Sequence, residues 1–209
     1  MLLLGVAVAG AAVCVGGMGM DRGIGTSQPL EPAERHRPSF SLGNRLSRVG
    51  WGLCWLLLAR WTPPPLHRWR CMLLRLWGAE IGRGARIYGS VRIWHPANLE
   101  VGDGSVLGPR VRCYNQGRIT IGRSVVVSQD ASLCASTHDV VDPVFPLRLR
   151  PIRIEDHAWV AAEAFVGPGV QVGTGAVLGA RGVAMRDLAP WTFFSGNPAQ
   201  PLKPRPQLP

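Results

Sequence analysis

The sequence has few acidic residues, and the resulting positive charge limits the kinds of molecule that the protein is expected to bind. Among its 209 residues, 13 Asp and Glu stand against 23 Lys and Arg, for a formal net charge of +10. A basic surface of this kind suits nucleic acid, anionic lipid or a phosphate-bearing ligand. No stretch interleaves basic and exposed aromatic residues as a recognisable nucleic-acid module does, so we expect no nucleic-acid partner.

Paired cysteines are also missing. The five cysteines are odd in number, scattered, and include no C-x-x-C pair: Cys14, Cys54, Cys71, Cys113 and Cys134. This pattern argues against a disulfide framework or a zinc ribbon and favours a reducing compartment. The sequence therefore predicts a cytoplasmic protein without a bound metal.

Long apolar runs are scarce. Residues 1–20 are uncharged and apolar, but Gly interrupts them and no Lys or Arg precedes them. A signal peptide, a marginal membrane span and a start site further downstream all stay open for this segment. We expect residues 1–41 to hold this apolar start and a disordered basic linker, because residues 21–41 mix Gly, Pro, Ser and charges without a period.

Residues 42–79 show helical spacing of apolar residues. The pattern predicts one helix from Leu42 to Arg60, with Asn44 as a candidate cap, and a second from Leu66 to Trp77 after "TPPP". The apolar run from Trp51 to Ala59 is too short to span a bilayer. The hairpin, with Arg and Trp at its edges, caps one end of a core or, in addition, rests on the inner face of an anionic membrane.

From Ile81 onward an aliphatic or small residue returns at every sixth position, grouped in trios. The fifteen positions are Ile81, Ile87, Ile93, Val101, Leu107, Cys113, Ile121, Val127, Leu133, Ile154, Val160, Val166, Val172, Leu178 and Ala184. Small or β-branched residues usually stand four positions later, and insertions follow the third hexad of a trio. A period of six fits no helix. It predicts a mainly β protein, a parallel β-helix of about five triangular coils, over residues 80–209.

These residues resemble the hexapeptide-repeat acyltransferases. "YNQ" at 114–116 and "STHD" at 136–139 narrow the resemblance to the colanic acid acetyltransferase branch, which is related to the galactoside and maltose O-acetyltransferases. The closing "NPAQPLKP" resembles the G-x-P-A ending of the family. The resemblance implies a left-handed β-helix, a homotrimer with active sites between protomers, acetyl-CoA as co-substrate and a saccharide acceptor. It covers roughly residues 42–205.

His138 is the candidate general base, because an imidazole titrates near neutral pH and both takes and returns a proton. It stands directly before an irregular loop, residues 139–153, which we expect to project over a neighbouring subunit. The resemblance makes Asn115 a ligand of the acceptor hydroxyl, although Asn before Gly is also ordinary turn chemistry. Tyr114 is a candidate lining residue of the acceptor pocket. Asp139 and Asp142 either orient the imidazole, contact the sugar or lie in solvent.

The donor site is predicted from the resemblance alone. Trp159 lies near the acetyl group or packs at a subunit interface, and the backbone N–H groups of Ala162 and Ala180 contact the thioester and the pantetheine arm. Arg186 and Lys203 are candidates for the nucleotide phosphates, or are solvated basic residues.

Three alternatives to sugar O-acetylation remain open. An N-acyltransferase acting on an amino sugar needs nearly the same base and groove. A non-catalytic scaffold needs only the coils. A γ-type carbonic anhydrase needs three zinc-bound histidines; the repeat region has His95, His138 and His157 but lacks that family's closely spaced pair.

Overall fold

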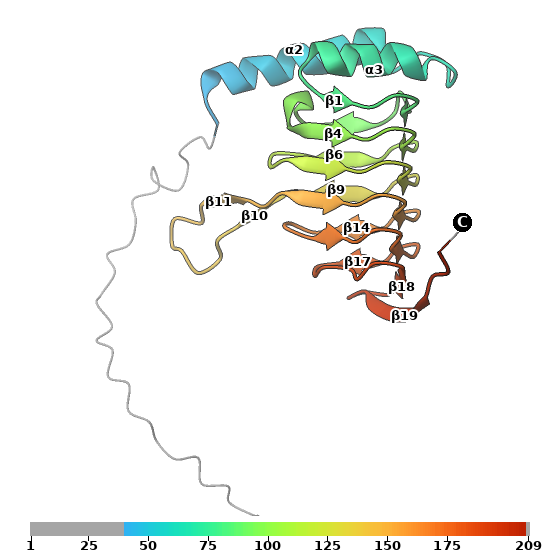
Figure 1. Ribbon diagram of the computed structural model, residues 1–209. Helices are drawn as coiled ribbons and strands as arrows, with labels where there is room; N and C mark the ends of the chain where they lie inside the picture. The colour runs from blue at the N-terminus through green and yellow to red at the C-terminus, as the bar shows by residue number, and fades with distance from the viewer. Residues whose placement is uncertain (1–39, 208–209) are drawn as a thin grey trace, which may run out of the picture.

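The described part of the chain begins with two helices and continues as a stack of three-sided coils along one axis (Figure 1). The computed structural model describes residues 40–207. The apolar start and most of the linker predicted for residues 1–41 therefore lie outside the described residues.

The two predicted helices are present with slightly shorter bounds, α2 at Leu42–Leu58 and α3 at His67–Leu76. The cap of α2 differs from the prediction, because the Ser41 Oγ accepts a hydrogen bond from the Asn44 N–H at 3.3 Å. Ser is a preferred N-cap residue, and it places Asn44 inside the first turn of the helix. The Asn44 Oδ1 instead accepts a bond from the Arg48 Nε at 3.2 Å.

The helices cover the first coil of the stack, as the capping interpretation predicted (Figure 1). The indole N–H groups of Trp51 and Trp55 donate to the carbonyls of Ile93 and Gly89 at 2.9 and 3.0 Å. Gly89 permits the close approach, since a Cβ there would lie 2.8 Å from the Ala59 carbonyl oxygen. Among the described helices, none is long and apolar enough to cross a membrane.

Arg70 fixes the turn between the helices. Its side chain is fully buried and donates to the carbonyls of Ile87 and Pro64, both at 2.6 Å, and to the Thr62 hydroxyl at 2.7 Å. Burial lowers the pKa of this guanidinium, yet its donors are met by oxygens, so the charge is tolerated inside.

Three parallel sheets form the sides of the stack. Sheet A contains β1 (Glu80–Ile81), β4 (Leu99–Val101), β7 (Ile119–Ile121), β12 (Ile152–Ile154) and β15 (Gln171–Val172). Sheet B contains β2 (Arg86–Ile87), β5 (Val106–Leu107), β8 (Val126–Val127), β13 (Trp159–Val160), β16 (Val177–Leu178) and β18 (Thr192–Ser195), with β19 (Gln200–Pro204) antiparallel at its end. Sheet C contains β3 (Arg92–Ile93), β6 (Arg112–Tyr114), β9 (Ser132–Cys134), β14 (Phe165–Val166) and β17 (Val183–Ala184).

The interior of the stack follows the predicted hexads. All fifteen six-residue positions are buried, and equivalent positions pair in register, as Val101 does with Ile121. Two of the residues four positions later are exposed, Ala97 and Thr137. Both stand where the chain leaves the coil, in the 3₁₀ helix η1 (Pro96–Asn98) and in β10 (Ser136–His138), so neither faces the interior.

Five complete coils are present, as predicted, and a partial sixth follows. It consists of a bridge between Val172 and Leu188 and of strand β18. Strand β19 then folds back on β18 and covers this end of the stack. The sixth coil follows no hexad trio, so the sequence pattern did not reveal it.

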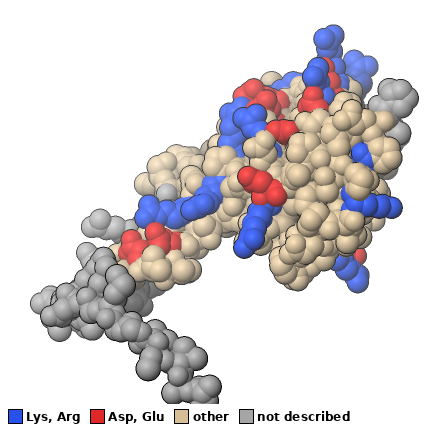
Figure 2. Space-filling view, turned by 60° about the horizontal axis from the view of Figure 1, so that its bottom comes forward, with Lys and Arg blue, Asp and Glu red and all other residues tan. Residues whose placement is uncertain are grey.

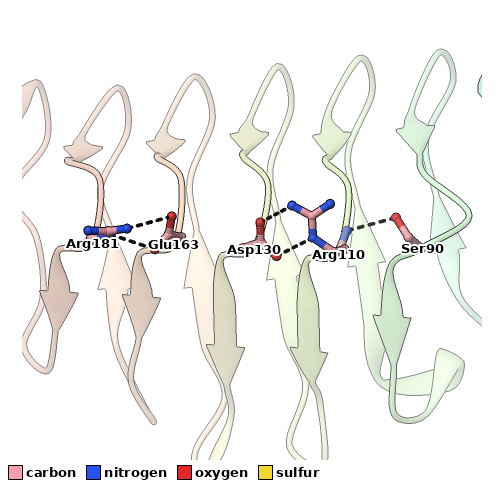
Figure 3. A network of polar contacts seen from close by, with 5 residues as sticks. All are labelled: Ser90, Arg110, Asp130, Glu163 and Arg181. Carbon is pink, nitrogen blue, oxygen red and sulfur yellow. Dashed lines mark hydrogen bonds and ion pairs between the residues drawn. The ribbon is translucent and has the colours of Figure 1, made fainter.

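The edge between sheets B and C carries a line of charged residues (Figure 3). Arg110 pairs with Asp130 at 2.6 Å and Arg181 pairs with Glu163 at 2.8 Å. All four have a positive φ near 60°, the left-handed conformation that a tight corner requires. The ion pairs join successive coils along this edge, which we call the B–C edge.

Candidate active site

His138 ends the strand β10, which leaves the stack after sheet C of the third coil. The predicted loop is a short antiparallel hairpin, because β10 pairs with β11 (Leu147–Leu149) and His138 lies opposite Leu147. The hairpin and the first part of α2 project past the same side of the stack (Figure 1). We call this side the C–A edge, since the chain passes there from sheet C to the next sheet A.

The imidazole of His138 is oriented by one backbone carbonyl. Its Nδ1 lies 2.9 Å from the Phe145 carbonyl oxygen, and the two rings stack with centroids 4.5 Å apart. A carbonyl oxygen can only accept, so Nδ1 carries the proton in the neutral ring. The Nε2 lone pair of this tautomer is then available to take a proton, as a general base requires.

The orienting group is neither of the two predicted acids. The Asp142 carboxylate accepts a hydrogen bond from the Val144 N–H at 2.9 Å, and the Asp142 backbone carbonyl accepts one from the Phe145 N–H at 2.8 Å. Asp139 pairs with Arg148 at 3.2 Å. The acids therefore shape the hairpin turn, and Phe145, with φ of 54°, presents its carbonyl to the imidazole. Sequence reasoning missed Phe145 because its contribution comes from the backbone.

A cavity of about 300 Å³ lies beside His138. Its lining comes from three parts of the chain: Phe40, Arg45 and Arg48; Tyr114 and Gln116; and Ser136, Thr137, His138 and Leu147. Tyr114 is 45% exposed, and its hydroxyl accepts a bond from the Gln116 Nε2 at 2.9 Å. The Oε1 of Gln116 is buried and has no hydrogen-bond partner among residues 40–207. The predicted lining residue Tyr114 thus faces the same space as His138.

Asn115 lies close in sequence but points elsewhere. Its side chain is 0% exposed, and its Oδ1 accepts from the N–H groups of Trp94 at 3.0 Å and His95 at 3.2 Å. The Nδ2 donates back to the His95 carbonyl at 2.6 Å. In a single chain the amide therefore holds the preceding coil corner and presents no surface to an acceptor. The turn interpretation of Asn115 accounts for these contacts.

Three of the five predicted donor residues lie on or beside the B–C edge, whereas the hairpin leaves at the C–A edge. Trp159 is 41% exposed on β13, and its indole N–H donates to the Ser128 hydroxyl at 2.9 Å. Ala162 and Ala180 occupy the B–C corners of the fourth and fifth coils. Within the described chain neither alanine N–H has a hydrogen-bond partner, a property shared by Gln129 one coil earlier. Both amides are therefore available to a ligand.

The two predicted phosphate ligands lie at the far end of the stack, on different sides. Arg186 is exposed and follows β17, near the C–A edge. Lys203 lies on β19 beside sheet B, with its Nζ 5.9 Å from the Phe193 ring centroid. One chain does not bring these two cations together.

Charge is mixed on the face shown in Figure 2, where Lys and Arg alternate with Asp and Glu.

Burial, and secondarily Arg48, lower the pKa of His95, so this imidazole is neutral near pH 7. Burial raises the pKa of the Cys113 thiol to about 12, which leaves it unreactive in the core. Within residues 40–207, no three His, Cys, Asp or Glu side chains stand together as metal ligands would.

The relatives of the chain agree with this architecture. No protein-family model matches it. The chain is 39% identical over 166 residues to an Escherichia coli (strain K12) protein described as "Putative colanic acid biosynthesis acetyltransferase WcaF", an alignment that covers 79% of this chain and 91% of that protein.

Two solved structures share the fold. One is a maltose O-acetyltransferase from Clostridium difficile, with a TM-score of 0.72, 20% identity and coverage of 80% of this chain and 90% of that one. The other is a hexapeptide-repeat acetyltransferase from Vibrio cholerae in complex with acetyl coenzyme A, with a TM-score of 0.73, 21% identity and coverage of 82% and 94%. The stack is the left-handed β-helix of these enzymes. With its hexads and its relationship to WcaF, the chain belongs to the hexapeptide-repeat acetyltransferases.

Proposed function

We propose that this acetyltransferase moves an acetyl group from acetyl-CoA to a hydroxyl of a sugar or lipid-linked saccharide used in cell-surface polysaccharide synthesis. The observation that carries the proposal is the imidazole of His138, which the Phe145 carbonyl holds through Nδ1 and which lines a cavity. The relatives named for galactoside, maltose and colanic acid acetylation support the acceptor class.

In the proposed reaction, His138 Nε2 takes the proton of the acceptor hydroxyl as its oxygen attacks the thioester carbon. The carbonyl becomes an oxyanion, and the N–H of Ala162 donates to it. The oxyanion collapses, the C–S bond breaks, and the departing thiolate takes the proton from the imidazolium. The products are the acetyl ester and free CoA, and the enzyme returns to its starting state.

The proposed site needs two copies of the chain. His138 projects at the C–A edge, whereas Trp159, Ala162 and Ala180 lie on or beside the B–C edge, across sheet C. A homotrimer that brings the B–C edge of one protomer to the C–A edge of the next completes the site. In this arrangement Arg186 and Lys203 of different protomers become available to the nucleotide phosphates.

The trimer is tested by complementation. His138→Ala and Ala180→Trp, which blocks the proposed pantetheine path, each inactivate the protein alone. Co-expressed and purified as mixed assemblies, they are expected to regain activity, because some interfaces combine an intact hairpin with an intact donor edge. Inactive mixtures, or a monomer by light scattering, contradict the shared site.

We further propose that the helical hairpin rests on an anionic membrane. The outward face of α2 exposes Leu42, Leu46, Val49, Leu53 and Leu57. The segment from Phe40 to Ala79 contains six Arg and no Asp or Glu. An apolar helix face flanked by cations binds the surface of an anionic bilayer. The double variant Leu46→Glu/Leu53→Glu is expected to abolish co-sedimentation with phosphatidylglycerol vesicles. If the variant instead loses its oligomeric assembly, the exposed face of α2 contacts a second copy of the chain and not a membrane.

The acceptor class is tested with purified protein, acetyl-CoA and a panel of neutral sugars, amino sugars and lipid-linked saccharides. Release of free thiol is measured, and the product bond is identified by its sensitivity to mild base. A base-labile ester on a saccharide supports O-acetylation. An amide on an amino sugar supports the N-acyltransferase alternative, and no transfer to any acceptor favours the scaffold.

A further inference from the structure

A second, larger cavity opens next to the His138 pocket. This groove, of about 780 Å³, lies between α2 and the outer face of sheet C. Its apolar lining includes Trp51, Trp55, Leu56, Trp94 and Phe165. Helix α2 forms one wall and strands of the first four coils form the other, so the groove extends toward the helical end of the stack.

The groove and the His138 pocket are continuous. Arg48 and Tyr114 line both cavities. The Arg48 guanidinium stacks 4.2 Å above the Trp94 ring and 5.8 Å from the Phe40 ring, while the Trp94 and Tyr114 centroids lie 6.3 Å apart. A ligand with its reactive hydroxyl at His138 therefore reaches the groove past Arg48.

The lining of the two cavities is basic. It includes five arginines, Arg45, Arg48, Arg60, Arg92 and Arg112, and no Asp or Glu. Within residues 40–207, none of the five is ion-paired. Arg110, and to a smaller extent Arg112, lower the pKa of Asp130, but the ion pair of Asp130 is with Arg110. The contrast with the B–C edge, where both arginines have acids, indicates that the groove offers its charge to a ligand.

The groove also runs away from the proposed donor site. Ala162 and Ala180 belong to the fourth and fifth coils, and Arg186 and Lys203 follow the fifth strand of sheet C. Apart from Phe165 of the fourth coil, the groove lining belongs to α2, Arg60 and the first three coils, nearer the helical end of the stack than those donor residues. A donor that approaches from one end of the stack leaves this space to the acceptor.

We propose that the groove binds the lipid diphosphate of a lipid-linked acceptor, an assignment that rests on the proposed function. The diphosphate lies against Arg48, Arg92 and Arg112, because guanidinium groups match phosphate oxygens in charge and geometry. The lipid chain follows the tryptophan-lined floor toward the helical end, and the saccharide extends to His138. Diphosphate recognition then distinguishes the acceptor from free sugars.

The first experiment measures binding of four probes to the full-length protein by calorimetry: farnesyl diphosphate, farnesol, inorganic pyrophosphate and UDP. Farnesyl diphosphate is expected to bind at least tenfold more tightly than each of the others, since only it has both the anion and the apolar chain. Equal binding of farnesol removes the diphosphate site. Equal binding of UDP replaces the lipid with a nucleotide. Displacement of farnesyl diphosphate by CoA assigns the groove to the donor.

The second experiment compares variants. Arg48→Gln/Arg112→Gln is expected to weaken farnesyl diphosphate binding at least tenfold. The matched control is Arg153→Gln on sheet A, an exposed arginine without an ion pair, which should leave binding within twofold. Circular dichroism checks that each variant is folded. Equal loss in both variants, or in neither, overturns the proposal.

His138→Ala separates this inference from the proposed function. The variant should lose acetyl transfer and keep farnesyl diphosphate binding. If the wild-type protein binds farnesyl diphosphate with the expected variant pattern but transfers no acetyl group, the groove stands and the proposed function fails. If the wild-type protein acetylates saccharides but does not bind farnesyl diphosphate, the proposed function stands and the diphosphate groove fails.

Discussion

The interior of the coil stack and the β10–β11 hairpin are neighbours in the chain but differ in almost every physical property. Leu133, in the last regular strand before the hairpin, is 0% exposed, whereas Val141, in the hairpin turn, is 87% exposed. The interior is held by packing between coils, and the hairpin by a few hydrogen bonds around Asp142. Stability depends on the interior of the stack and the proposed chemistry on the hairpin. Mutations in the interior should therefore lower stability, and mutations in the hairpin should lower activity.

The sharpest test of this separation is His138→Ala. Because His138 is exposed and contributes little packing, the melting temperature should stay unchanged. Loss of the proposed general base should lower kcat by about 10²- to 10⁴-fold. Thiol release and thermal unfolding measure the two effects, and near-normal turnover in the variant would remove His138 as the base.

The complementary change is Leu133→Ala, which leaves a cavity between coils. We expect the free energy of unfolding to fall by about 2–5 kcal/mol. The control, Val141→Ala, should change it by no more than about 0.5 kcal/mol, because the side chain is in solvent. Chemical denaturation measures both values. If the two variants lower the free energy of unfolding by similar amounts, the interior and the hairpin do not differ in their contribution to stability.

Asn115 tests which region its side chain serves. If it belongs to the stack, Asn115→Ala should lower the free energy of unfolding by about 1–3 kcal/mol, since the His95 N–H loses its acceptor and the Trp94 N–H keeps only the Cys113 carbonyl. Tyr114→Phe is the comparison, and it should raise the acceptor KM without changing stability. A stable Asn115→Ala protein with a raised acceptor KM instead restores the acceptor-binding prediction.

Asp142→Ala probes the hairpin itself. Without the Asp142 carboxylate the Val144 N–H loses its acceptor, which loosens the turn that presents the Phe145 carbonyl to the imidazole. We expect kcat to fall roughly 10- to 100-fold, as small misplacements of a catalytic group do, with an unchanged melting temperature. Asp142→Asn retains the acceptor oxygen and should recover most of the activity. A defect in Asp142→Asn as large as in Asp142→Ala would mean that the charge, and not the turn, matters.

The smallest effect is expected at Asp156, which joins two coils at the edge between sheets A and B. The Arg123 backbone N–H, followed by its side chain, lowers the pKa of Asp156. A lowered folded-state pKa adds stability above the unfolded pKa of about 3.9, and this stability is lost as the pH falls through the folded value. Asp156→Asn should therefore melt below wild type at pH 7, and the difference in melting temperature should shrink as the pH falls below the unfolded pKa of about 3.9. A constant difference across this range would show that the ionised form contributes nothing.

Much of the molecule was predictable because its determinants are local. The six-residue period requires only that a buried residue return at each side of a coil. The sequence alone therefore predicts that residues such as Ile81 and Leu178 point into the interior of the stack. Tyr114 and His138 were found through short motifs, and the structure places them on one cavity. The cap of α2 was assigned to Asn44 rather than Ser41, since both are good cap residues and only the backbone geometry chooses between them.

The sequence by itself determined the coils, the helices before them and the break that carries His138, because periodicity and chain order encode these features directly. Only the tertiary structure decided the contacts between distant segments. The Phe145 carbonyl reaches His138 through backbone geometry, Asn115 turns into the stack, and Arg48 meets Tyr114 at the mouth of the groove. Such contacts depend on how far each segment projects from the stack, and no local pattern specifies that distance.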